Sequence, residues 1–189
     1  VPEQLRYRYY LETLRLIDRG IPSELVRGFH PPGEKTFFPV PAGWAQYELL
    51  PEPNRYGVLF TRELLQLPFT QFDTGVLYLR YEQTGKRAGK EKAQPEEVLE
   101  AFFNDAVEKI ADPRKTVQTT DPAYRRGADR YRTATLTYTE GLQPRVERWL
   151  IFYEAARDRL HTLTFRSTGS DGGQWSPFVE ALFDTAEFS

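Results

Sequence analysis

The chain has 189 residues and a formal net charge of −2, because 25 lysine and arginine side chains nearly balance 27 acidic ones. Hydrophobic residues make up 40% and charged residues 28%, which is typical of a globular chain and excludes extended disorder. The near-neutral balance excludes a global attraction to nucleic acid or anionic lipid, and the absence of cysteine excludes disulfides, thiol catalysis and cysteine-based zinc sites.

The length favours one domain with an appendage over two domains. No apolar run approaches the roughly 18 residues of a membrane-spanning helix, so we expect any membrane association to be peripheral. Methionine is absent, the initiator included, and we expect a mature form from which a targeting segment has been removed.

The N-terminal stretch predicts an amphipathic helix over residues 2–19, with Gly20 as its stop. Its apolar face packs either on its own domain or on a partner. The face is formed by Tyr7, Tyr10, Leu11, Leu14 and Ile17. A Gly- and Pro-rich linker runs on to residue 35, so the predicted domains are 1–35, a helix and linker, and 36–189, the main domain.

The main domain opens with an extended segment, TFFPVPAGW, in which Pro39 and Pro41 fit only an edge strand because proline cannot donate to a sheet. Three strands are then predicted at 45–50, 56–60 and 75–82.

A helix is predicted after the polar loop QTGKRAGKEKAQ. Pro95 suits its first turn, and Glu96 and Glu97 favour the positive end of the helix dipole. Apolar residues recur at helical spacing: Leu99, Phe102, Phe103, Ala106 and Ile110.

The C-terminal half predicts three antiparallel strands, within ADRYRTATLTYTE, RVERWLIFYEA and RLHTLTFRST, with a turn at 155–158. RWLIFY is apolar on both faces, which predicts a central strand covered on both sides. A last helix is predicted from Ser176 as N-cap and Pro177 as first residue, with Phe178, Val179, Leu182 and Phe183 at helical spacing.

Two Phe-Asp-Thr tetrapeptides raise the hypothesis of an aspartic-type hydrolase, whose two carboxylates would lie about 3 Å apart and share one proton. Asp73 precedes a glycine and an apolar strand, as such a site requires. Asp184 lies at the end of a helical pattern with only five residues after it. We therefore predict no catalytic residue and retain the hydrolase as the outside alternative.

The histidines indicate no metal site. His161 alternates with apolar residues and is expected on a buried face, while His30 lies in a Pro-rich loop. No His-x-x-x-His or Glu-x-x-His spacing is present.

The polar loop before the first main-domain helix carries a local positive charge, from Lys86, Arg87, Lys90 and Lys92. It is either an ordinary solvated loop or a docking element for an acidic protein surface, and nucleic acid is the least favoured reading. Arg125 and Arg126, with Arg130 and Arg132, could extend the patch, although the latter two alternate in a strand and fit its polar face.

Four segments in this order resemble the PsbP-like family: FFPVPAGW, PEEVLEAFF, VERWLIFYEAARDRLHTLTF and QWSPFVEALFDTAEFS. The resemblance covers residues 36–189. It implies an α+β fold, an αβα sandwich with a central antiparallel sheet flanked by helices, to which the N-terminal amphipathic helix is added. LLQLPFTQF departs from the family pattern as an insertion.

The resemblance also implies a function without catalysis. Photosynthetic members are extrinsic proteins of photosystem II in the thylakoid lumen, which dock through basic residues on membrane subunits and help to retain calcium and chloride. It thus implies a photosystem partner, with Lys86, Arg87, Lys90, Lys92, Arg125 and Arg126 as the binding residues, and a calcium association without a bound cofactor. The alternative is a bacterial extracytoplasmic binding domain of the same fold, in the periplasm or at the cell surface.

Overall fold

The structure is a computed structural model that describes residues 26–49, 55–62, 77–85, 94–119, 125–126, 129–169 and 173–188. The chain divides into two compact units. The first unit contains residues 1–44 together with 171–189, and the second contains residues 45–170. The predicted N-terminal helix at 2–19 lies outside the described residues.

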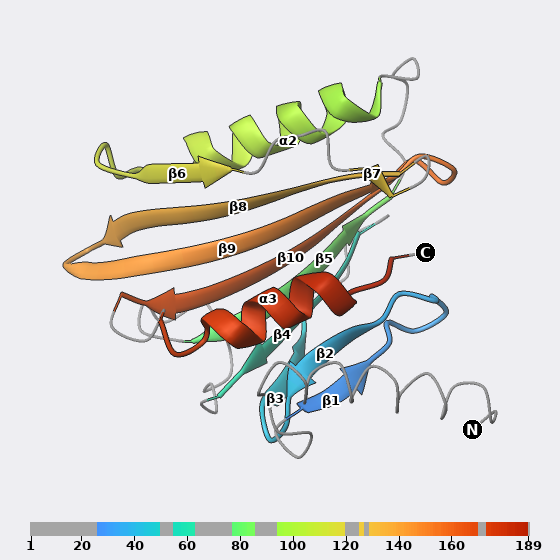
Figure 1. The fold of residues 1–189 in the computed structure, drawn as a ribbon, viewed down its shortest axis with the longest axis horizontal. Coiled ribbons are helices and arrows are strands. Elements are labelled where there is room, and N and C mark those ends of the chain that lie inside the picture. Colours follow the sequence, from blue (N-terminus) through green and yellow to red (C-terminus); the bar gives the residue numbers. More distant parts are fainter. Residues whose placement is uncertain are drawn as a thin grey trace. The chain divides into compact units, whose positions relative to one another are not determined.

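The first unit contains a two-stranded antiparallel sheet, β1 (Val26–Phe29) paired with β2 (Phe38–Pro41) (Figure 1). Because both strands of such a pair are edges, Pro39 and Pro41 occupy edge positions, as predicted. The linker prediction for residues 20–35 is wrong at 26–29, which form β1. Gly28 makes this pairing possible, since a Cβ there would lie 2.5 Å from the ring of Phe37.

Helix α3 (Ser176–Thr185) contacts β2 within the same unit. Its N-cap is Trp175 rather than the predicted Ser176, and the Trp175 ring packs edge-on against Trp44 with centroids 5.5 Å apart. After the helix, Phe37 and Glu187 exchange backbone hydrogen bonds of 2.7 and 2.8 Å. These contacts join the C-terminal segment to β2.

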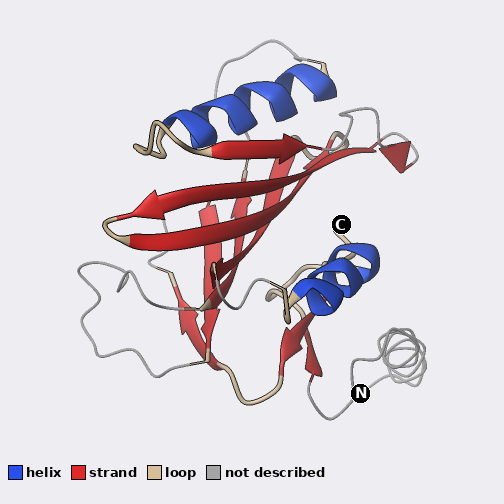
Figure 2. Cartoon of the chain, turned by 60° about the vertical axis from the view of Figure 1, so that its left-hand side comes forward, coloured by secondary structure: helices blue, strands red, loops and turns tan. Residues whose placement is uncertain are grey.

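The described residues of the second unit form an eight-stranded antiparallel sheet (Figures 1 and 2). Its order is β3-β4-β5-β10-β9-β8-β6, and β7 also pairs with β8. The strands are β3 (Ala45–Glu48), β4 (Arg55–Thr61), β5 (Tyr78–Thr84), β6 (Thr116–Thr119), β7 (Arg125–Arg126), β8 (Asp129–Glu140), β9 (Gln143–Glu154) and β10 (Arg159–Thr168).

The predicted C-terminal strands are confirmed as a meander of β8, β9 and β10. Strand β9 lies between β8 and β10, and every residue from Trp149 to Glu154 is buried, as its two apolar faces predicted. The turn from β8 to β9 contains Gly141 at a φ of 62°. In the β9–β10 turn Asp158 has a φ of 52°, and its carboxylate accepts a 2.6 Å hydrogen bond from the Tyr153 hydroxyl.

Helix α2 (Pro95–Glu108) packs on β8 and β9, on one face of this sheet. Val98, Leu99 and Phe103 are its buried residues, and the Phe103 ring lies edge-on to Trp149 with centroids 6.0 Å apart. On the sheet this core is formed by Ala134, Leu136, Tyr138, Trp149, Ile151, Tyr153 and Leu160. The fold is therefore α+β, with a large antiparallel sheet and two described helices. In the described ranges no helix is both long and apolar enough to cross a membrane.

Candidate binding site at one end of the sheet

Three strand ends of the second unit meet in register at one end of the sheet. Arg55 at the start of β4 lies opposite Thr84 at the end of β5, and Leu160 near the start of β10 lies opposite the same threonine. The β9–β10 turn lies at this end too, because it leads directly into β10. Three segments distant in sequence, around residues 55, 84 and 155–160, thus lie side by side (Figure 1).

A pocket of about 590 Å³ opens at this end. The described residues that line it are Arg55, Tyr56, Gln83, Gly85, Ala156, Arg157 and Arg159. Its three arginines come from the start of β4, from the β9–β10 turn and from the start of β10. None of these described lining residues is acidic, so the lining carries three positive charges.

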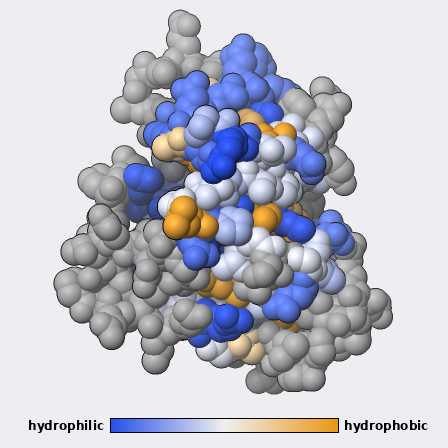
Figure 3. Space-filling model, turned by 90° about the vertical axis from the view of Figure 1, so that its left-hand side faces the viewer, coloured by the Kyte–Doolittle hydropathy of each residue, from blue (hydrophilic) through white to orange (hydrophobic). Residues whose placement is uncertain are grey.

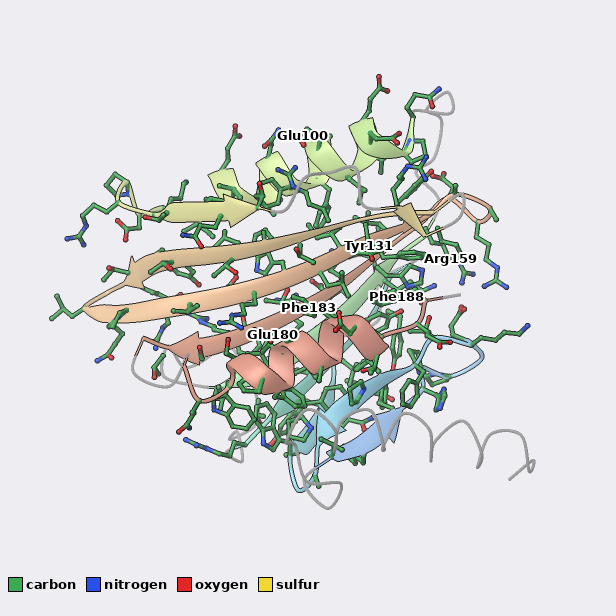
Figure 4. The ribbon with its side chains drawn as sticks, viewed as in Figure 1. Glu100, Tyr131, Arg159, Glu180, Phe183 and Phe188 are labelled. Atoms are coloured by element: carbon green, nitrogen blue, oxygen red, sulfur yellow. The ribbon has the colours of Figure 1, made fainter. Side chains whose placement is uncertain are left out.

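Two of the arginines make ion pairs with carboxylates outside the lining. Arg55 Nη2 lies 3.4 Å from Glu82 Oε1, and Arg157 Nε lies 3.4 Å from Glu154 Oε1. Both arginine side chains are about half exposed, at 48% and 47%. Exposed ion pairs of this kind contribute little stability, about 0 to 1 kcal/mol, so an incoming anion competes with them at low cost. Arg159, labelled in Figure 4, lies at the same end of the sheet.

Two polar residues, Tyr56 and Gln83, also line the pocket. The Tyr56 hydroxyl is buried and has no hydrogen-bond partner within the described part of the chain. Burial, with a smaller effect of Glu48, raises the pKa of Tyr56, so the hydroxyl stays protonated at neutral pH and can donate. Gln83 is 9% exposed and lies opposite Tyr56 in the β4–β5 register.

His161 is fully buried, as predicted. It lies opposite the pocket residue Gln83 in the β5–β10 register. Its Nδ1 lies 2.9 Å from the Tyr81 hydroxyl, and its Nε2 lies 3.5 Å from Glu154 Oε2. Glu154 in turn contacts Arg157, so a chain of polar contacts runs from the pocket to the buried histidine. Over the described ranges, no group of three or more His, Asp or Glu side chains could hold a metal ion.

The predicted basic loop follows a pocket residue in the sequence. Lys86, Arg87, Lys90 and Lys92 lie outside the described residues. Gly85, the last described residue before these four in the sequence, lines the pocket.

Arg125 and Arg126 form β7, which pairs with Arg130 and Asp129 of β8. Arg130 lies opposite Tyr153, and Tyr153 lies opposite Leu160, so β7 belongs to the same end of the sheet. The structure thus brings the backbone of these two predicted residues to the end that bears the pocket. The sequence analysis did not identify Arg55, Arg157 and Arg159, because each one resembles an ordinary strand-end or turn arginine until the register is known.

Arg130 and Arg132 do not extend an exposed basic patch. Arg130 Nε lies 2.6 Å from Glu96 Oε1, and Arg132 pairs with Glu100 of α2, labelled in Figure 4. The Arg132 guanidinium also lies 3.8 Å from the centre of the Phe103 ring. Their side chains are only 14% and 8% exposed, so these two arginines attach α2 to the sheet.

A buried polar cluster lies toward the opposite end of the sheet. Glu147 accepts hydrogen bonds from the Tyr138 hydroxyl at 2.6 Å and from Trp149 Nε1 at 2.8 Å. Arg166 lies 3.8 Å from Glu147 and also pairs with Glu140, whose carboxylate is 3.4 Å from Arg145 Nε. Two arginines and two glutamates balance each other here, and the cluster shares the sheet face that bears α2.

The surface that faces the viewer in Figure 3, the end that bears the β8–β9 turn, is mostly hydrophilic among its coloured residues. Its hydrophobic side chains are scattered singly. Leu142, in that turn, is 95% exposed. Among the described residues on this side, no large apolar patch suggests a protein interface.

The hypothesis of a two-aspartate site concerns one described residue. Asp184 is exposed and lies in the last turn of α3, as the helical pattern predicted, whereas Asp73 lies outside the described residues. The absence of catalytic residues remains a prediction.

No protein-family model matches the chain, and no curated protein matches it at the level of sequence. Solved structures do match. The solution structure of cyanobacterial PsbP (CyanoP) from Synechocystis sp. PCC 6803 is similar with a TM-score of 0.58 and 14% sequence identity, over 88% of this chain and 94% of that one. A protein of unknown function from Pseudomonas aeruginosa gives a TM-score of 0.45 at 12% identity, over 84% of this chain and 94% of its own.

The likeness to CyanoP extends over nearly the full length of both chains and agrees with the resemblance in the sequence. At this identity it speaks for the fold and for nothing beyond it. The chain has a PsbP-like fold.

Proposed function

We propose that this chain is a non-catalytic, extrinsic PsbP-like binding protein that docks through the basic end of its sheet on an acidic surface of a membrane protein complex. The partner proposed is a photosystem, specifically photosystem II, on the lumenal side of the thylakoid membrane, where the chain supports assembly, stability or oxygen evolution. The observation that carries the proposal is the arginine-lined pocket, whose lining residue Gly85 directly precedes the Lys86–Lys92 loop in the sequence.

The charge of the whole chain supports a local rather than a global mode of docking. A net charge of −2 gives no general attraction to acidic surfaces. Arg55, Arg157 and Arg159 therefore attract an acidic partner only in one orientation, and the four basic residues of the loop that follows Gly85 in the sequence would add to this attraction. Such complementarity raises the association rate and fixes the orientation of the partner more than it raises affinity.

Other parts of the proposal rest on the resemblance. They are the complete αβα sandwich with helices on both sides of the sheet, the thylakoid lumen as compartment, and an association with calcium through the assembled partner. No residue of this chain is proposed as a calcium ligand.

Co-sedimentation with photosystem II membranes depleted of their extrinsic proteins tests the proposal. We expect the chain to bind at low ionic strength and to be released near 1 M NaCl, where the screening length falls to about 3 Å. Replacing Lys86, Arg87, Lys90 and Lys92 by Glu should abolish binding. Arg157→Glu with Arg159→Glu should weaken it by about tenfold or more, as expected for loss of charge-assisted contacts.

Arg114→Glu is the matched control, since Arg114 is 78% exposed and lies in the loop between α2 and β6, toward the opposite end of the sheet. Binding that resists salt, or that the control variant weakens as much as the pocket variants do, would contradict docking through this end. If only membranes of a non-photosynthetic bacterium bind the chain, the photosystem part of the proposal is wrong.

A further inference from the structure

We propose that the arginine-lined pocket binds a small organic anion that carries at least two phosphate or carboxylate groups. Binding of this anion requires no partner surface, although it would use the same arginines as the docking proposed above. The ligand would lie among Arg55, Arg157 and Arg159, with Tyr56 and Gln83 as hydrogen-bonding groups.

The size of the pocket points to a molecule rather than to a single ion. Its volume of about 590 Å³ lies within the range of roughly 300 to 1,000 Å³ that is typical of small-molecule sites. A monatomic anion could contact only part of such a lining. A ligand with several oxygen-bearing groups could reach arginines that come from two separate segments, the start of β4 and the β9–β10 turn with the first residue of β10.

The charge of the lining points to an anion. Its described residues include three guanidinium groups and no carboxylate. Arg55 and Arg157 each have one carboxylate contact of 3.4 Å from outside the lining. A guanidinium has five N–H donors in a planar fork, which suits the paired oxygens of phosphate and carboxylate.

The Tyr56 hydroxyl supplies an independent argument. A buried hydroxyl is less favourable without a hydrogen-bond partner than with one, and this one has no partner within the described residues. An oxygen of a ligand held by the arginines could accept its proton. The group that is unsatisfied in the free protein would then contribute to binding.

The backbone that carries these side chains is ordered without a ligand. Strands β4, β5 and β10 are paired in continuous register up to Arg55 and Leu160. The β9–β10 turn is closed by the 3.3 Å backbone hydrogen bond from Arg157 to Glu154 and by the contact of Tyr153 with Asp158. Binding therefore requires little ordering of the backbone, which favours affinity.

Isothermal titration calorimetry with pyrophosphate and with citrate tests the site, at constant ionic strength maintained with NaCl. We expect saturable binding of at least one probe, with a Kd below about 1 mM. Arg159→Gln should weaken binding by about tenfold, since it removes a charge-assisted bidentate contact. Tyr56→Phe should weaken it by roughly threefold to tenfold through the lost hydroxyl. Arg157→Gln, on a half-exposed side chain, repeats the arginine test with little risk to folding.

Arg114→Gln is the control, because it removes the same charge from an exposed side chain, and circular dichroism verifies that each variant is folded. Preference for one probe assigns phosphate or carboxylate chemistry to the ligand. The proposal is overturned if neither probe saturates by about 10 mM, equivalent to a binding free energy weaker than about 2.7 kcal/mol. It is also overturned if Arg114→Gln weakens binding as much as Arg159→Gln does. Because no membrane is present, this outcome is separate from that of the docking experiment.

Discussion

Two tyrosines of the second unit, Tyr78 and Tyr138, are buried beside charged groups on the sheet face that bears α2. Burial raises the pKa of both, and the neighbouring Glu147 raises it further, although Arg166 acts in the opposite direction. For Tyr138 the hydrogen bond to Glu147 adds to the effect, because the carboxylate favours the protonated phenol. Both hydroxyls therefore stay neutral and can donate hydrogen bonds, while both side chains fill part of the core.

The raised pKa values predict loss of stability at alkaline pH. In the unfolded chain these phenols ionise near pH 10, the ordinary pKa of tyrosine. Their folded pKa values lie higher, so their contribution is fully present below pH 10 and decreases as the pH rises above it. Absorbance at 295 nm should show that Tyr78 and Tyr138 ionise only when circular dichroism shows unfolding.

In the Tyr138→Phe variant, about one tyrosine fewer should ionise in the step that coincides with unfolding, because the substitution removes one of these two buried phenols. If all tyrosines of the folded protein ionise together near pH 10, the buried arrangement of this cluster is wrong.

At the scale of elements, α2 is attached to the sheet by one apolar stripe and by two ion pairs, from Glu96 and Glu100 to Arg130 and Arg132 of β8. Phe103 lies at the centre, between the Trp149 ring and the Arg132 guanidinium. Phe103→Ala should therefore lower the free energy of unfolding by about 3 to 5 kcal/mol, the usual cost of truncating a buried phenylalanine. Urea denaturation followed by circular dichroism measures this difference.

Glu108→Ala, on the exposed side of the same helix, should change the free energy by no more than about 0.5 kcal/mol. Equal effects of the two substitutions would mean that α2 is not held by this stripe.

The elements that the sequence predicted are those with a local signal. Helix α2 shows a 3.6-residue apolar period, and β8, β9 and β10 are long, rich in β-branched residues and joined by short turns. Strand β6, by contrast, has no buried residue among Thr116–Thr119, and β7 has two residues. Neither offers an alternation that could be recognised. Strand β1 was not predicted, because the sequence around it is rich in Gly and Pro.

The candidate site shows the same limit. The basic loop was found from the sequence because its charges are adjacent along the chain. The pocket depends instead on the pairing of β5 with β10, which joins residues 78–84 to 160–166. Such long-range register is decided by packing of the whole sheet, and single-sequence patterns do not contain it. Arg55 and Arg159 are about a hundred positions apart and could not be grouped beforehand.

At the scale of the whole molecule, positive charge is concentrated in one place although the net charge of the chain is negative. The pI of about 5.8 predicts an anionic protein at neutral pH, yet the described lining of one pocket carries three arginines, and four basic residues follow its Gly85 in the sequence. A cation-exchange resin responds to the local electric field of such a patch as well as to the net charge of the whole protein. A cation-exchange column therefore distinguishes a concentrated patch from an even distribution of charge.

We expect the chain to be retained on a cation-exchange resin at pH 7 and low salt, although its net charge is −2. Arg157→Glu with Arg159→Glu should lower the salt concentration needed for elution, because both charges belong to the patch and salt screens the remaining attraction. Arg114→Glu with Lys109→Glu makes the same total change of charge on exposed side chains near the end of α2, and should shift elution less. Flow-through of the unmodified chain, or equal shifts for the two double variants, would contradict a basic end of the sheet.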